Sequence, residues 1–299
     1  MIKRLLLTLT LIASLGLALA QDTTEFVIRI DNVSSAVDEG STTDRIDDFA
    51  VLLSPGIYLV HTDIAPLFTP GRLDRGEGLE ALAENGDPTV LARTLDESAD
   101  RTLIDVGTFT SPMGTSASGP IGPGESYEFT ITAAPGQEFT FATMYVQSND
   151  IFLAPSEQGI QLFDTNGNPI DAEVTSAVFY WNAGTEESEQ PGEGIFQAPR
   201  QPRAGAGEVE GDPIRRLDSA AAVDEVNQST VEDTEEDVGN REAGEDFGEI
   251  IDDDPVDVVD SEGGTGEGSV DDANQVTYVY PAVEDVIRVT ITPRTTTVD

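Results

Sequence analysis

The sequence has no cysteine, one lysine (Lys3) and one histidine (His61). Without cysteine the fold cannot rest on disulfides, so core packing or a bound metal must stabilise it. The cysteine and histidine residues that form the usual zinc sites, Cys–His dyads and serine triads are also almost entirely missing. The sequence has no glycine-rich phosphate loop. We interpret His61 as a hydrogen-bonded residue at a strand end. We therefore expect the protein not to be an enzyme.

Basic residues are scarce compared with acidic ones. Lysine and arginine together number 15 against 57 aspartates and glutamates, giving a formal net charge of -42. Such a surface repels nucleic acid and anionic membranes and attracts cations. We expect no nucleic-acid partner.

The first residues have the pattern of an export signal. Lys3 and Arg4 precede an apolar run over 5–19, and Ala18-Leu19-Ala20 is a small-x-small cleavage site. We assign 1–20 to a cleavable signal peptide and expect a secreted or periplasmic protein that is not transmembrane after cleavage. The alternative is an uncleaved anchor, but the apolar run is short for a membrane span.

Alternating apolar residues and frequent turns predict an antiparallel β-sandwich over 21–200. A glycine- and proline-containing turn at 54–56 is expected to end the second strand, with 57–60 as its continuation beyond the turn. Pro135-Gly136 is expected to connect neighbouring strands. Short helices are predicted at 79–84 and 88–95, capping one end of the sheets. The strands are expected at 26–30, 49–53, 127–131, 139–146, 160–163 and 174–181.

An acidic segment over 201–273 contains 24 acidic residues against 4 basic ones. Its few apolar residues cannot offset the entropy of ordering, so we predict a disordered insertion. Strand patterns at 276–280 and 286–291 then place the final strands of the sandwich in 274–299. The insertion therefore loops out of a single domain.

Oxygen-bearing side chains follow two predicted strands and form a candidate cation site. Asp150 lies in the loop after 139–146, Asn182 follows Trp181, and Glu186 lies four residues further on. Gly184 permits a tight turn between the last two. Carboxylate and amide oxygens are the ligands that Ca²⁺ prefers. The alternative is that all three are solvated loop residues of a very acidic protein.

These motifs, taken in order, resemble the spondin N-terminal domain, in particular that of bacterial secreted proteins. The resemblance covers roughly 26–199 and the last strand, and leaves the acidic insertion out. The matching pieces are Ser54-Pro55-Gly56, Pro66-Leu67-Phe68, 76–84, Pro123-Gly124, Ala142-Thr143-Met144, Ser148-Asn149-Asp150 and 181–186.

The resemblance implies an all-β, C2-like sandwich with a single Ca²⁺ site at one end. By position, the metal ligands would be Asp150, Asn182 and Glu186, where the animal domains have three aspartates. Asn182 removes one negative charge and Glu186 adds a methylene, so the affinity is expected to be weaker or retuned. The disulfides of the animal domains have no counterpart.

We therefore expect a secreted, non-enzymatic calcium-binding domain that acts in adhesion or in extracellular or surface association. Its partner would be an extracellular or cell-surface protein or glycan. One alternative is that the acidic insertion is the functional part, buffering cations or maintaining solubility. Another is a carboxylate-based hydrolase, but no feature of the sequence selects its catalytic acid.

Overall fold

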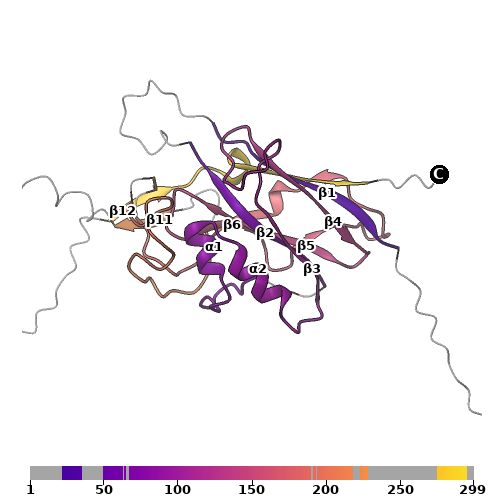
Figure 1. Ribbon diagram of the computed structural model, residues 1–299, viewed down its shortest axis with the longest axis horizontal. Coiled ribbons are helices and arrows are strands. Elements are labelled where there is room, and N and C mark those ends of the chain that lie inside the picture. The colour runs from indigo at the N-terminus through magenta and orange to yellow at the C-terminus, as the bar shows by residue number, and fades with distance from the viewer. Residues whose placement is uncertain are drawn as a thin grey trace, which may run out of the picture.

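The computed structural model describes residues 22–35, 50–62, 64, 67–189, 191–192, 194–217, 223–227 and 275–294. Two antiparallel sheets face each other and two short helices lie outside them (Figure 1). The predicted all-β sandwich is confirmed. The predicted signal peptide lies outside the described residues.

The smaller sheet joins the two ends of the domain. Its strand order is β4 (Ser126–Ala133), β1 (Thr24–Asn32), β13 (Ile287–Pro293) and β8 (Ala172–Glu173). β1 is buried at every second residue, because alternate side chains of a strand point to opposite faces. The predicted late strand is thus confirmed, and it lies inside the sheet rather than at its edge.

The larger sheet carries the candidate site at one end. Its order is β10 (Arg215–Leu217), β9 (Val178–Asn182), β6 (Ile151–Pro155), β5 (Glu138–Tyr145), β2 (Leu53–His61) and β3 (Leu103–Phe109), while β7 (Ile160–Gln161) also pairs with β5. Short 3-10 turns, Thr175–Ala177 and Val283–Asp285, precede β9 and β13.

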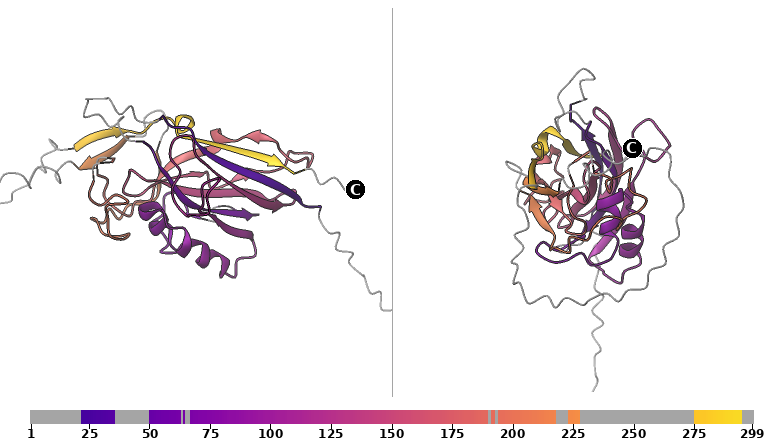
Figure 2. Two further views of the ribbon diagram at one scale, coloured as in Figure 1. Left: turned by 45° about the horizontal axis from the view of Figure 1, so that its top comes forward. Right: turned by 90° about the vertical axis from the view of Figure 1, so that its left-hand side faces the viewer.

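Both faces of the larger sheet are covered, which makes three layers. One face packs on the smaller sheet through a core that includes Phe26, Phe139 and Tyr180. The other face packs on helices α1 (Leu79–Asn85) and α2 (Thr89–Asp96). Figure 2 shows the helices along this outer face, whereas the sequence placed them at one end of the sheets. The predicted helix positions are confirmed.

The turn predicted at 54–56 is not the end of a strand. β2 begins at Leu53 and runs through Pro55 to His61, so the strand predicted at 49–53 shares only Leu53 with it, whereas the continuation expected at 57–60 is part of the strand. The register with β5 shifts between Leu53 and Gly56. A β-carbon on Gly56 would lie 2.2 Å from the carbonyl oxygen of Ala142 and 2.3 Å from the Phe109 ring. The glycine is therefore required by close packing inside the sheet and not by a chain reversal.

The Pro135-Gly136 turn forms as predicted, with the amide of Gln137 donating to the carbonyl of Ala134 at 3.1 Å. Its flanking strands are not paired neighbours, however. β4 pairs with β1 in the smaller sheet, and β5 pairs with β2 in the larger one. The turn crosses from one layer to the other because Phe139 and Ile131, on either side of it, both point into the core between the sheets.

Strands β3 and β6 are absent from the prediction. β6 is only five residues long and begins next to the polar turn at 147–150. Such a short apolar run carries little periodicity, and a proline ends it. β3 alternates weakly in burial and its interior includes Gly107, where a β-carbon would collide with the Tyr58 ring.

The segment predicted to be disordered is ordered at its start. Residues 201–217 pack against the domain, and β10 pairs with β9. β11 (Val223–Asn227) pairs antiparallel with β12 (Gln275–Val279), so the chain leaves and re-enters at adjacent strands. These two strands form a sheet of their own, so the strand predicted at 276–280 is present but does not belong to the sandwich sheets. Residues 218–222 and 228–274 lie outside the described part of the chain.

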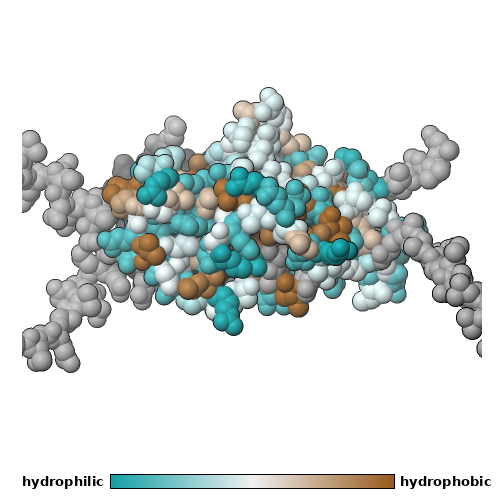
Figure 3. Space-filling view, turned by 60° about the horizontal axis from the view of Figure 1, so that its bottom comes forward, coloured by the Kyte–Doolittle hydropathy of each residue, from teal (hydrophilic) through white to brown (hydrophobic). Residues whose placement is uncertain are grey.

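Hydrophobic residues on the face shown in Figure 3 occur as separate spots among polar ones. Among the described residues, large exposed hydrophobic side chains include Leu73, Ile195 and Val209. Neither helix of the described residues has the length and apolar character needed to cross a membrane.

Candidate functional site

Strands β6 and β9 bring the three predicted site residues together. Asp150 immediately precedes β6 and Asn182 is the last residue of β9. The neighbouring Ile151 pairs with Asn182 across the two strands, and the amide of Ala183 donates to the carbonyl of Asp150 at 3.2 Å. The loop after β9 then folds back over Asp150. The juxtaposition expected from the sequence is thus present in the fold.

All three side chains are buried rather than solvated. Asp150 and Asn182 are 0% exposed, and Glu186 is 1% exposed. Asp150 Oδ2 accepts from the amides of Thr185 at 2.8 Å and Glu186 at 3.4 Å. The alternative of three solvated loop residues therefore does not describe this end of the sheet.

The side chain of Asn182 stabilises the turn that follows it. Its Oδ1 accepts from the amide of Gly184 at 2.7 Å, which shapes the turn that leads to Glu186. Gly184 has a φ of 68°, and a β-carbon there would lie 2.1 Å from the carbonyl oxygen of Asp212. The Asn182-x-Gly184 pattern thus sets the course of the loop and brings Glu186 back to Asp150.

Two further buried carboxylates, Glu84 and Glu189, belong to the same cluster. Glu84, 0% exposed, comes from the last turn of α1, and Glu189 from the loop after β9. Asn149 connects the loop members: its Nδ2 donates to Glu186 Oε2 at 3.3 Å and to Glu189 Oε2 at 3.0 Å. Its Oδ1 accepts from the Glu189 amide at 2.8 Å and from Gln197 Nε2 at 3.1 Å.

Backbone amides are the main partners of these acids. Glu189 accepts from the amides of Ile195 and Phe196, while Glu84 Oε2 accepts from the Gly205 amide and Glu186 Oε1 from the Gly207 amide. Within the described ranges, no arginine or histidine forms an ion pair with Glu84, Glu186 or Glu189. Neutral donors thus face a cluster of buried acids.

Burial and mutual repulsion raise the pKa of Glu186 to about 7. Desolvation is the largest cause, and the charge of Glu84 adds to it, whereas the Gly207 amide opposes the rise. The pKa of Glu84 is also raised, first by burial, and the Gly205 amide and the nearby Thr185 hydroxyl oppose that shift. Negative charge at this site is therefore incompletely compensated.

One carboxylate oxygen of the cluster is left without a hydrogen bond. Glu84 Oε1 is buried and makes none to any residue that the structure describes. Leaving a buried carboxylate oxygen unsatisfied is costly, and such orphans point to a group that completes the site. An all-oxygen, anionic donor set of this kind fits a hard cation such as Ca²⁺.

The side chains are not gathered around one point as they stand. No group of three or more acidic, histidine or cysteine side chains in the described chain is placed to hold a metal ion. Asp150 is turned toward the loop amides, and Glu84 and Glu186 are each turned toward residues 205–207. Binding a cation would require some of these carboxylates to rotate.

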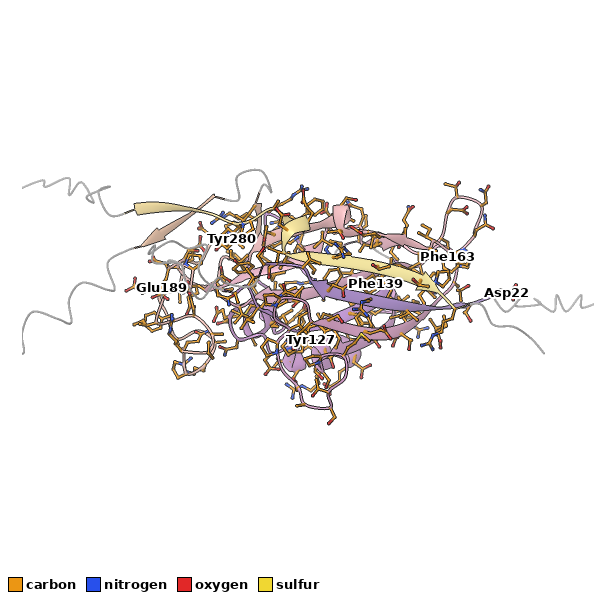
Figure 4. The ribbon with its side chains drawn as sticks, turned by 90° about the horizontal axis from the view of Figure 1, so that it is seen from above. Asp22, Tyr127, Phe139, Phe163, Glu189 and Tyr280 are labelled. Carbon is orange, nitrogen blue, oxygen red and sulfur yellow. The ribbon has the colours of Figure 1, made fainter. Side chains whose placement is uncertain are left out.

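Sequence reasoning missed Glu84, Glu189 and the glycines at 205 and 207 as members of the site. Glu84 lies on a helix whose apolar residues define the buried face, so its burial has no separate signal. Residues 205–207 lie in a segment whose composition is typical of disorder. At the end of the molecule opposite Asp22, Figure 4 shows Glu189.

No protein-family model matches the chain, and no curated protein sequence matches it. The site must therefore be judged by its own chemistry.

Proposed function

We propose that the protein is a secreted, non-enzymatic calcium-binding domain of spondin type that acts in adhesion or in extracellular or surface association. The observation that carries the proposal is the buried carboxylate cluster formed by Glu84, Asp150, Glu186 and Glu189. Glu84, Glu186 and Glu189 form no ion pair with any residue in the described chain. A bound cation would compensate their charge.

Asp150 and Glu186 would hold the ion, together with Glu84 Oε1, the carboxylate oxygen that makes no hydrogen bond to the described residues. The ion supplies fixed positive charge at the junction of α1, β6 and the loop after β9. Asn182 Oδ1, which accepts from the Gly184 amide at 2.7 Å, is the neutral oxygen that the sequence assigns to the site.

Charge compensation would tie three elements together. α1, the turn before β6 and the loop after β9 each contribute a carboxylate, and Glu84 of α1 repels Glu186 of the loop. A bridging ion stabilises this arrangement, because it binds the folded domain and not the unfolded chain. The loops at this end would then form a rigid surface for an extracellular or cell-surface protein or glycan. Resemblance to spondin domains supports this assignment.

Calorimetric titration of the mature protein with CaCl₂ tests the proposal. The ionic strength should be about 0.15 M, where diffuse binding to the acidic surface is screened. Asp150→Asn removes a central charge without changing size, and Asp96→Asn at an exposed position is the matched control. We expect one saturable site that Asp150→Asn abolishes and Asp96→Asn retains.

A different result would favour the acidic insertion as the functional part. Weak uptake that neither substitution changes would mean that calcium associates with the charged surface as a whole. The proposed site would then be wrong, and cation buffering by the segment 228–274 would be the better account.

A further inference from the structure

The chain after Gln201 forms a strap across the carboxylate cluster. We define the strap as residues 201–211, which run between the end of α1 and the start of the chain that leads into β10. It belongs to the segment that the spondin resemblance leaves out. In Figure 2 the chain preceding β10 lies beside α1 at the same end of the molecule.

The two ends of the strap are firmly anchored. Gln201 Nε2 donates to the carbonyl of Glu84 at 2.6 Å and to Asn85 Oδ1 at 2.8 Å. Just beyond the other end, the amide of Asp212 donates to the carbonyl of Gly184 at 3.0 Å, and β10 follows in the sheet. The strap is therefore held at both ends independently of the carboxylates.

The middle of the strap is held mainly by the acids themselves. The Gly205 amide donates to Glu84 Oε2 and the Gly207 amide to Glu186 Oε1, while the Glu208 carbonyl accepts from the Glu187 amide. Residues 204–207 are half-buried, and Glu208 and Val209 are exposed. Residues 204–207 are alanines and glycines, so they have little apolar side chain to bury, and Arg203 Nη1 donates to the strap's own carbonyls of Ala204 and Gly205. The hydrogen bonds to the carboxylates are therefore the main ties between the middle of the strap and the domain.

Glycine at 207 is required by this contact. Its φ is not in the left-handed region, yet a β-carbon would lie 2.5 Å from Glu186 Oε1 and 2.7 Å from its Cδ. A side chain at 207 would have to displace the Glu186 carboxylate or the strap, so glycine permits this close approach. The Gly207 amide thus donates to an oxygen that a cation could otherwise bind.

We propose that the strap is a latch that competes with calcium for Glu84 and Glu186. This inference rests on the proposed calcium function. Docked strap amides turn the two carboxylates toward residues 205–207 and keep them buried. Cation binding requires these two carboxylates to rotate away from residues 205–207, which breaks their hydrogen bonds to the strap amides. The middle of the strap is then released while both ends stay attached, and residues 204–207, half-buried in the docked strap, become exposed.

Hydrogen–deuterium exchange of the full mature chain tests the latch. CaCl₂ should speed exchange of the amides at 205–208 in the wild-type protein, whereas MgCl₂ at equal concentration serves as the comparison. Gly207→Ala should show fast exchange there without calcium. Its calcium affinity should rise about fivefold or more, the lower range of typical coupling between sites. Gly119→Ala is the matched control, since its β-carbon meets open space.

A second variant tests the latch independently, in case Gly207→Ala does not fold. Gln201→Ala detaches the strap from α1 without touching either carboxylate, and it should also raise calcium affinity. Slower strap exchange with calcium, or unchanged or weaker affinity in folded Gly207→Ala, would overturn the latch while leaving calcium binding intact. Absence of saturable binding in every variant would instead overturn the proposed function, and the latch with it.

Discussion

Glu84 and Glu186, at the end of the sandwich that holds the carboxylate cluster, are buried acids that repel each other. Glu186 is 1% exposed, and its strongest electrostatic neighbour is another acid, Glu84. A buried charge without an opposite partner lowers stability by several kcal/mol or takes up a proton. The same residues that would bind a cation therefore decide how the domain responds to pH.

Stability without calcium should fall as the pH rises through the titration of Glu186. Its pKa is raised from its ordinary value of 4.5 to about 7. The protonated form suits the buried site, so the contribution is fully present below 4.5 and lost as the pH rises through about 7. Urea unfolding in the presence of a chelator, between about pH 5 and pH 8, measures this loss.

Glu186→Gln should flatten that profile, because the amide has no charge to bury. Its advantage over the wild-type protein should grow toward high pH. Glu97→Gln, at an exposed position, is the control and should run parallel to the wild type. Parallel profiles for Glu186→Gln as well would contradict the assigned titration.

Gly56→Ala should destabilise the domain by about 1–3 kcal/mol, the usual range for overpacking. The added methyl would lie 2.2 Å from the Ala142 carbonyl oxygen and 2.3 Å from the Phe109 ring, both in paired neighbouring strands. Urea unfolding of this variant beside Gly119→Ala separates the collision from the general effect of replacing glycine. Equal stability of the two would mean that β2 and β3 shift to admit the methyl.

Elements of secondary structure explain why the sequence predicted so much of the fold and only part of the site. Phe26, Ile28 and Ile30 alternate cleanly, and Leu79, Leu82 and Ala83 have helical spacing, so β1 and α1 follow from local pattern. Which strands join the same sheet depends on long-range packing, which no local pattern encodes. That is why Pro135-Gly136 appeared to connect neighbours within one sheet.

The site, too, contains residues that follow from local sequence pattern and residues that are placed by long-range packing. Asp150, Asn182 and Glu186 follow strand ends and could be predicted, whereas Glu84 reaches the cluster only because α1 packs on the larger sheet. The strap could not be predicted, because its order comes from hydrogen bonds to residues far away in the chain: Glu84 lies 121 residues from Gly205.

Helix α1 should couple core packing to calcium binding. Leu82 is 0% exposed in the core between α1 and the larger sheet, and Glu84 lies two residues further on. Leu82→Ala should cost about 2–5 kcal/mol and weaken calcium binding, because the helix that positions Glu84 loses its main contact. Leu73→Ala, at a residue 58% exposed, is the control. Thermal unfolding and calorimetry measure the two effects; an unchanged affinity would exclude Glu84 from the site.

At the scale of the whole molecule, the acidic segment is attached to the domain by adjacent strands. β11 and β12 pair from Val223 to Asn227 and from Gln275 to Val279. Residues 228–274, which include 18 acidic residues and one basic residue, can therefore be replaced by a short glycine-asparagine linker. A deletion starting at Gln201 would instead remove the strap and β10.

Deletion of 228–274 should leave folding and the saturable calcium site unchanged, because neither β10 nor the carboxylate cluster lies in it. Diffuse, salt-sensitive calcium uptake should fall with the lost charge. Circular dichroism and calorimetry at low and high salt distinguish the two kinds of binding. Loss of the saturable site on deletion would assign the function to the insertion instead.

The pairing of β1 with β13 has a consequence for how the protein is made. β13 lies between β1 and β8, so the smaller sheet lacks an internal strand until the ribosome has passed Pro293. A product that stops anywhere in the acidic segment leaves β1 with an open edge and the core without Ile287, Val289 and Ile291. Such a fragment should be cleaved faster by a protease than the full chain, because completion of the smaller sheet depends on its last strand.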